Sequence, residues 1–337
     1  MINKVIQSVV ALSIVTTMAF GAQGVMLNVV SGNAEAKYNT MINEKIKSIG
    51  FVLSDPHARI NDAYATKYGS KTLEDGKPNP NYDPAWNKNL DTLGFFSVSN
   101  DVKIRELLLK APELGGFSPF NLHMFKPVNE DNTYVGHVVP QTMLDIVGIK
   151  DEALRKEFIG TFSELDAMVQ KEIGGVAKVS EYKSLPAKPM MQFEITFDRP
   201  AELGAYLDEF QEKFEAAFEK NKYIIAGFKN YKEAYTDLNL EFSKYDAYFT
   251  YSLCHFTFSY NIFNKGRPDA GAFAPCSMYM YIAKDTNKLV IGMPRLANWT
   301  SVLHIEDAVM QKSITDLDIE ITKIMLSLGA KEIWKNY

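Results

Sequence analysis

One segment of the sequence occurs twice at a constant spacing. Gly115-Gly116-Phe117-Ser118-Pro119 recurs as Gly271-Ala272-Phe273-Ala274-Pro275, 156 positions later. The offset then holds without a gap as far as Asp151, which matches Asp307. A shared register of this length predicts two copies of one small domain. It predicts duplicated architecture and does not by itself predict duplicated chemistry.

Each copy shows the same succession of patterns. Two strand-like runs flank a polar turn at 120–139, and again at 276–293. Apolar residues at helical spacing then follow in both copies, at 154–169 and at 314–328. This succession predicts an α+β fold with two repeated domains, each an antiparallel sheet with helices packed on one face.

The patterns also predict domain boundaries. The first repeat domain is expected at 37–175 and the second at 191–337, with a linker at 176–190 that is rich in Lys, Glu and Pro. Because a duplicated small domain often takes the place of a homodimer, the two domains are expected to pack on each other as a pseudo-dimer.

Residues 1–36 are expected to direct the chain out of the cytoplasm. Lys4 precedes an apolar stretch at 5–20, as in an export signal. Small residues that could mark a cleavage site follow in two groups: Ala19, Gly21 and Ala22, then Ala34 and Ala36. The apolar character extends to Val30, long enough for an uncleaved membrane anchor. There are three readings: a cleaved signal, an anchor at 5–30, and a buried N-terminal helix. The first two predict that the folded body is periplasmic or otherwise exported. The anchor would also hold the body at the inner membrane.

Charge and composition limit the partners. The net charge is −5 and the sequence pI is about 5.7, with 36 Lys and Arg residues that form no basic run. Because neutralising phosphates requires clustered cations, no nucleic-acid partner is expected. The expected partner is a small molecule or a periplasmic protein.

The repeat core resembles the domain-of-unknown-function 302 family. The resemblance rests on a short helix, a Gly-x-Phe-x-Pro segment, a hairpin and a covering helix, at 115–140 and 271–294. The family often has Pro-Cys at the start of this hairpin, which the second copy keeps as Pro275-Cys276 and the first replaces with Pro119-Phe120. Tandem copies occur in the family, and it has no established reaction. The resemblance therefore implies the fold and leaves the function open.

Two histidines lie on the arms of the first hairpin. His123 and His137 would sit opposite each other if the connecting loop had an odd number of residues, and on opposite faces if it had an even number. Facing imidazoles would supply two ligands for a metal or a haem iron. Ordinary sheet histidines are the alternative. The second copy has Tyr279 and Met293 at these positions, so the histidine pair is not duplicated, and Tyr279 and Met293 are counted with His123 and His137 as candidate ligand-binding residues.

The sequence has two cysteines, Cys254 and Cys276, on strands expected to be neighbours. In an oxidising compartment two such cysteines suggest a disulfide, provided that the strand register brings their Cα atoms within about 7 Å. Two separate buried thiols are the other reading. Cys254 and His255 are adjacent, so on a strand they would point to opposite faces and could not share a metal. The methionines near Cys276 are interpreted as core packing, with a soft-metal site as the alternative. The aromatic run at 245–263 is also interpreted as core packing, with an apolar ligand pocket as the alternative.

No nucleophile elbow or phosphate-binding glycine loop is present. The leading expectation is therefore an exported, non-enzymatic protein that binds a small molecule or a partner. The alternative is a periplasmic metal, haem or thiol redox protein that uses His123 and His137, or the two cysteines. The sequence identifies no cofactor and no reaction.

Overall fold

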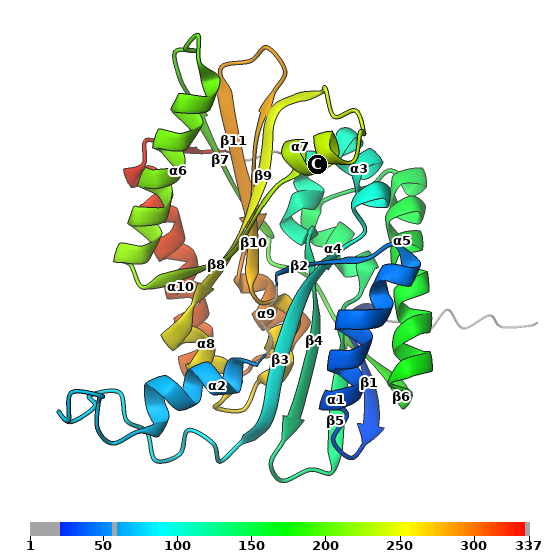
Figure 1. The fold of residues 1–337 in the computed structure, drawn as a ribbon, viewed down its shortest axis with the longest axis vertical. Coiled ribbons are helices and arrows are strands. Elements are labelled where there is room, and N and C mark those ends of the chain that lie inside the picture. Colours follow the sequence, from blue (N-terminus) through cyan, green and yellow to red (C-terminus); the bar gives the residue numbers. More distant parts are fainter. Residues whose placement is uncertain (1–20, 56–58, 334–337) are drawn as a thin grey trace, which may run out of the picture.

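The computed structural model describes residues 21–55 and 59–333. These residues form two six-stranded antiparallel sheets, one in each copy (Figure 1). The first sheet has the order β2-β3-β4-β5-β1-β6, with β1 (Ala22–Ser31), β2 (Val52–Asp55), β3 (Leu90–Ser99), β4 (Phe120–Pro127), β5 (Asn132–Val138) and β6 (Val176–Tyr182). The second has the order β8-β9-β10-β11-β7-β12, with β7 (Met190–Thr196), β8 (Tyr223–Asn230), β9 (Tyr245–His255), β10 (Cys276–Ala283), β11 (Lys288–Pro294) and β12 (Lys331–Glu332).

The two sheets share one topology. Strands β1 to β6 occupy the same places in the first sheet as β7 to β12 in the second. The β4–β5 and β10–β11 hairpins begin 156 residues apart, and both Pro119 and Pro275 follow cis peptide bonds. The predicted duplication and the predicted α+β class are therefore confirmed.

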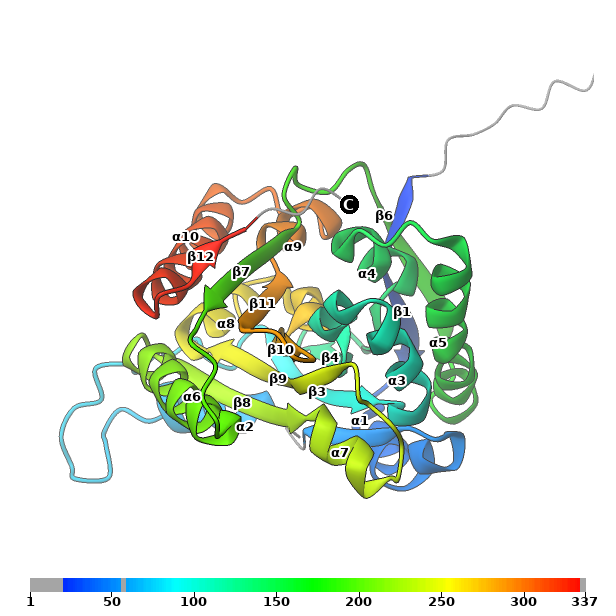
Figure 2. The same ribbon diagram turned by 90° about the horizontal axis from the view of Figure 1, so that it is seen from above.

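Each sheet carries helices of its own copy on its outer face. The first has α1 (Glu35–Thr40), continued by η1 (Met41–Lys45) and η2 (Ile46–Ile49), and α5 (Glu152–Glu172); the second has α6 (Leu203–Lys220) and α10 (Ala308–Ser327). The closing helices α5 and α10 start alike, because Asp151 and Asp307 each accept a backbone N–H at 2.8 Å. Figure 2 shows α6 and α10 together on the outer face of the second sheet.

The inner face of each sheet is covered by segments of the other copy. The remaining helices are α2 (Ile60–Tyr64), η3 (Ala65–Gly69), α3 (Asp101–Lys110), η4 (Pro112–Phe117), α4 (Pro140–Val147), α7 (Tyr231–Asp237), α8 (Phe256–Phe263), η5 (Pro268–Phe273) and α9 (Ala297–Val302). On the second sheet, Tyr248 Oη donates to the carbonyl of Pro112 at 2.5 Å. On the first, His123 Nε2 donates to the carbonyl of the equivalent Pro268 at 2.7 Å. The prediction of helices on one face is thus refined: each sheet is covered on both faces.

Strand β1 corrects part of the predicted leader. Residues 22–31 form a strand that pairs with β5 on one side and β6 on the other, with Val25 opposite Val138 and Leu27 opposite Lys178. The apolar run at 25–30 therefore belongs to the sheet, not to a membrane anchor. The rest of the predicted leader, Lys4 and 5–20, lies outside the described residues. Within the described ranges, no helix is long and apolar enough to cross a membrane.

Two other predicted elements differ in the structure. The predicted linker at 176–190 begins with β6, an exposed edge strand whose Lys and Glu residues face solvent. The aromatic run at 245–263 is not strand throughout: β9 ends at His255, which caps the helix α8 by accepting the N–H of Phe258 at 3.2 Å. Buried side chains of both copies form one continuous hydrophobic core.

Candidate ligand-binding site

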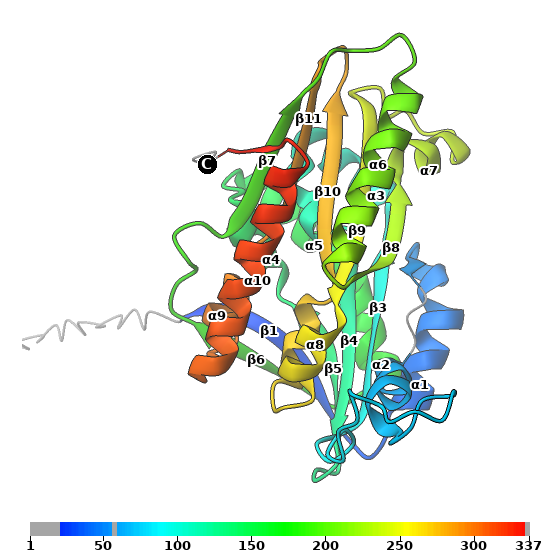
Figure 3. The ribbon, with the colours of Figure 1, turned by 90° about the vertical axis from the view of Figure 1, so that its left-hand side faces the viewer.

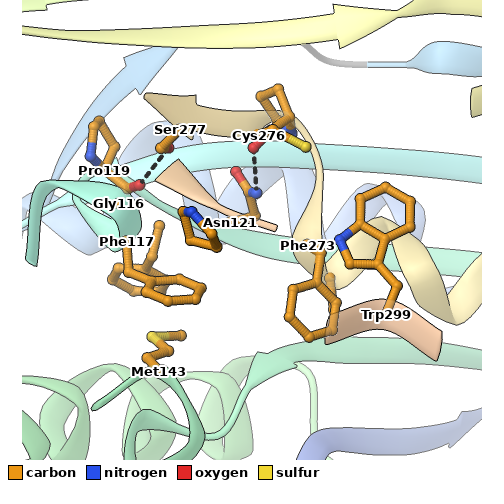
Figure 4. A pocket seen from close by; sticks show the side chains of 13 residues that line it. Gly116, Phe117, Pro119, Asn121, Met143, Phe273, Cys276, Ser277 and Trp299 are labelled. Carbon is orange, nitrogen blue, oxygen red and sulfur yellow. Dashed lines mark hydrogen bonds between the residues drawn. The ribbon is translucent and has the colours of Figure 1, made fainter. Parts of the chain in front are cut away.

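An interdomain pocket, here called the axis pocket, is built from equivalent residues of the two copies (Figure 4). Its lining includes, as pairs 156 positions apart, Phe117 with Phe273, Pro119 with Pro275, Phe120 with Cys276, Asn121 with Ser277, and Met143 with Trp299. Asn121 Nδ2 donates to the carbonyl of Pro275 at 3.0 Å, and Ser277 Oγ donates to the carbonyl of Pro119 at 3.3 Å. The two copies are therefore joined across a pseudo-twofold axis.

The axis pocket is a contact between the two copies rather than a ligand site. Its free space is about 20 Å³, roughly the room that one buried water molecule needs. Asn121 and Ser277 already use their side chains across the interface. No large apolar cavity with unused polar groups is left there for a ligand.

A second pocket lies inside the second copy, between its sheet and α10, and is here called the α10 pocket. Its lining is mostly apolar and includes Leu253, Phe258, Met293, Trp299, Leu317 and Ile321. The polar members are Tyr223, Cys254, His255, Ser259 and Cys276. Cys276 and Trp299 line the axis pocket as well, so these two side chains separate the two spaces.

The first copy has an equivalent pocket that aromatic side chains fill. Phe120 takes the place of Cys276, and its ring centroid lies 4.4 Å from that of Phe162. Asn100 caps α3 where His255 caps α8, and it lines the first pocket as His255 lines the second. The free space is about 10 Å³ in the first copy and about 20 Å³ in the second. The copies therefore differ in chemistry at one shared position in the fold.

An open groove adjoins the α10 pocket on the molecular surface, here called the α6–α10 groove. It encloses about 520 Å³ and is lined by Asn221, just after α6, and by the α10 residues Asp316, Ile319, Glu320, Lys323, Ile324 and Ser327. Figure 3 shows α6 and α10 running along the same face of the second sheet. Tyr223 follows Asn221 by two residues, and Ile321 follows Glu320. Glu320 of the groove also acts on Tyr223 of the α10 pocket, so the groove and the pocket meet at these two side chains.

Burial controls the titrating groups of the α10 pocket. It raises the pKa of the Cys254 thiol to about 11 and also raises that of Cys276. It lowers the pKa of His255, against the opposing effect of Glu320. Burial, and then the nearby Glu320 carboxylate, raise the pKa of Tyr223. At neutral pH the pocket therefore holds thiols, a phenol and an uncharged imidazole.

The structure separates His123 and His137. The connecting loop is 128–131, an even number of residues, and the register pairs His123 with Gly136. His123 faces the other copy, while His137 faces α5 and contacts Asp166 at 2.8 Å. The prediction of a shared metal or haem site is therefore wrong, because the two imidazoles leave opposite faces of the sheet.

Tyr279 and Met293 are separated in the same way. Tyr279 pairs with Gly292, one residue before Met293. Tyr279 lies against Gly115 of the first copy, whereas Met293 lines the α10 pocket. Of the four predicted ligand-binding residues, Met293 alone belongs to this pocket.

Cys254 and Cys276 are both free thiols that line the α10 pocket. The structure does not contain the predicted disulfide, and the sheet register pairs Cys276 with Leu253, not with Cys254. Cys254 Sγ is instead 3.9 Å from Ser259 Oγ. Cys254 and His255 line one pocket, contrary to expectation, because the strand ends there. Within residues 21–55 and 59–333, no three His, Cys, Asp or Glu side chains are arranged to hold a metal ion.

Sequence reasoning missed Tyr223 and Glu320 and used Trp299 nowhere. Their segments carry no motif, and they meet only through the packing of β8, α9 and α10. The exchange of Phe120 for Cys276 was visible in the repeat, and it was the available signal that the second copy holds the wider pocket.

Comparison with known proteins does not identify a family or a function for this chain. No family model matches the sequence, and no curated protein matches it. A crystal structure described as an uncharacterized conserved protein DUF302 from Bacillus stearothermophilus is 15% identical in sequence, with 41% of this chain and 96% of that chain covered and a TM-score of 0.33. A likeness at that TM-score carries no argument about this protein.

Proposed function

We propose that this chain binds a small molecule in the α10 pocket and its adjoining groove, and catalyses no reaction on it. The observation that carries the proposal is the difference between the equivalent pockets of the two copies. Phe120 fills the first, whereas the smaller Cys276 leaves the second lined by apolar side chains and a few polar groups. Such a combination is typical of ligand sites.

The size of the groove supports the same proposal. Small-molecule sites usually enclose about 300–1,000 Å³, and the α6–α10 groove encloses about 520 Å³. The α10 pocket alone is too small for more than about one water molecule. The ligand therefore lies mainly in the groove and inserts one end by displacing flexible side chains such as Met293.

A thiol redox function is the competing proposal, favoured by two cysteines on one pocket. It would join the two Sγ atoms and pass two electrons to an oxidant such as a quinone, with release of two protons. Because burial raises both thiol pKa values, little thiolate is present at neutral pH to react. Ligand binding is the better supported function. Location outside the cytoplasm stays part of the proposal and rests on residues 1–20.

The uncharged dye N-phenyl-1-naphthylamine tests the site, since its emission rises in apolar surroundings. The wild type should bind one dye per chain. Cys276→Phe, which copies the first pocket, and Leu317→Phe, which narrows the pocket from α10, should both abolish binding. Val309→Phe adds a ring at a position on α10 that is 74% exposed, and it should bind as the wild type does. Equal binding by all four proteins, or none by the wild type, would refute the proposal; circular dichroism checks that each variant folds.

A further inference from the structure

Among the described residues, two buried polar atoms beside the α10 pocket make no hydrogen bond of ordinary length. They are Tyr223 Oη and Glu320 Oε1. Tyr223 is only 4% exposed and lines the pocket, while Glu320 lines the adjoining groove. A buried polar atom that has lost water and gained no partner costs roughly 1–3 kcal/mol. A bound group at this point would remove that cost.

The aromatic surroundings of Tyr223 define the shape of this point. Its ring centroid lies 5.1 Å from that of Phe218 and 5.0 Å from that of His255, each in an edge-to-face arrangement. Glu320 acts on Tyr223 by its charge and as a weak hydrogen-bond partner, and it acts on His255 by its charge. The carboxylate and the phenol therefore sit at one place, where the groove meets the apolar pocket.

The two other carboxylates near Glu320 are already engaged. Asp318 is buried, but its carboxylate accepts the N–H of Leu296 at 2.8 Å and of Ala297 at 3.1 Å. Asp316 in the groove pairs with Lys312. Lys323 also lines the groove, and no described ion pair joins it to Glu320. Of these three carboxylates, Glu320 is thus the one that no described ion pair and no backbone N–H engages.

The chemistry of these atoms selects the head group. A carboxylate oxygen only accepts hydrogen bonds, and a phenol oxygen can accept one while its ring attracts a cation. An ammonium group supplies three donors and a positive charge, and so satisfies both. Beyond this point the pocket wall consists of Phe258, Leu317 and Ile321, which suits an apolar body.

We propose that the ligand of the α10 pocket is a small amphipathic amine. Its ammonium group donates to Glu320 and Tyr223, and its apolar body extends over the pocket lining and the groove. This inference rests on the proposed function and names the ligand class for the same site.

Three compounds of one shape test the head group by titration calorimetry: 2-phenylethylamine, 2-phenylethanol and 3-phenylpropionate. The wild type should bind the amine most tightly and the carboxylate least. Glu320→Gln keeps the shape and removes the charge, so it should weaken amine binding about tenfold to a hundredfold and change alcohol binding less than about threefold. Glu306→Gln removes an exposed charge just before α10 and should keep the wild-type preference. Tyr223→Phe should weaken the amine as well.

The outcomes separate the two proposals. If the wild type binds the alcohol or the carboxylate as tightly as the amine, or if Glu320→Gln keeps the preference for the amine, the amine assignment is wrong while the site still stands. If none of the three compounds binds and the dye does not bind either, the proposed function fails.

Discussion

Gly115 and Gly271 show what the repeated motif does at the level of single residues. A Cβ atom on Gly115 would lie 2.2 Å from Tyr248 Oη, and one on Gly271 would lie 2.3 Å from His123 Cε1. Both values are far below van der Waals contact, so only glycine lets η4 and η5 approach the opposite sheet. The motif common to both copies is therefore a docking surface between them, and the residues that differ, such as Phe120 and Cys276, shape the pockets.

His123 should make stability depend on pH. Burial lowers its pKa from 6.5 to about 4, so the folded protein keeps this imidazole neutral where the unfolded chain protonates it. Its contribution is complete above about pH 6.5 and is lost as the pH falls towards 4; the depression of the pKa corresponds to about 3 kcal/mol. Below pH 4 both states bind the proton and the loss stops.

His123→Gln tests this dependence, because glutamine can still donate to the carbonyl of Pro268 and does not titrate. Urea unfolding at several pH values should show a shallower loss of stability between pH 6.5 and 4 in the variant than in the wild type. Above pH 7 the two curves should run parallel. Identical slopes in the acid range would show that His123 is not the group responsible.

At the scale of elements, β1 has the largest consequence. It is an interior strand of the first sheet, between β5 and the edge strand β6, and Val25 on it is buried. The second group of expected cleavage residues, Ala34 and Ala36, follows β1, whereas the first group, at 19–22, precedes it or touches its start. Cleavage after Ala36 would remove an interior strand, so a cleaved signal is compatible with this fold only at the earlier group.

Two truncations distinguish these cases. A chain lacking residues 1–20 should fold and melt as the full chain does. A chain lacking residues 1–36 should lose its thermal transition and aggregate, because the β5 and β6 edges and the apolar core beneath β1 become exposed. The measurements are circular dichroism melts and size-exclusion chromatography. An unchanged melt without residues 1–36 would mean that β1 is dispensable.

The elements that could be predicted from sequence are those with a long, clear period. The helices at 154–169 and 314–328 and both hairpins were confirmed, since their apolar spacing and turn residues agree. Strand β1 was hidden because its apolar residues, at 25–30, directly continue the apolar run of the expected leader. Helix α8 was hidden because eight aromatic-rich residues fit a strand as well as a helix, and its cap is the unusual His255.

The candidate site could be predicted only in part. The sequence singles out Cys254 and Cys276 as a possible disulfide. It singles out Met293 as a candidate ligand-binding residue together with Tyr279. The pocket that Cys254, Cys276 and Met293 share depends on strand register and on where β9 ends, and a one-residue difference in register moves a side chain to the other face. Tyr223 and Glu320 come from segments almost a hundred residues apart, so no local pattern joins them.

At the scale of the whole molecule, the two copies interlock. The inner face of each sheet is covered by η4 or η5 of the other copy, and both copies contribute to one hydrophobic core. The buried side chains of the two copies belong to one cluster. The chain is therefore two domains in topology and one unit in packing.

Calorimetry should accordingly show a single unfolding transition for residues 21–337, with a calorimetric enthalpy equal to the van't Hoff enthalpy. Asn121→Ala leaves the buried carbonyl of Pro275 without its donor and should lower the one transition, by about 1–3 kcal/mol, without splitting it. Two resolved transitions would mean that each copy folds independently.

The pseudo-twofold axis also bears on how such a protein can change. In a true homodimer, one mutation alters both sides of the axis at once, so a change that opens a pocket on one side opens it on the other and weakens the assembly twice. Here the halves are covalently joined, and each position mutates alone. Cys276 can leave space for a pocket in the second copy while Phe120 fills the equivalent space in the first. The first copy can therefore keep the fold stable while the pocket residues of the second copy change.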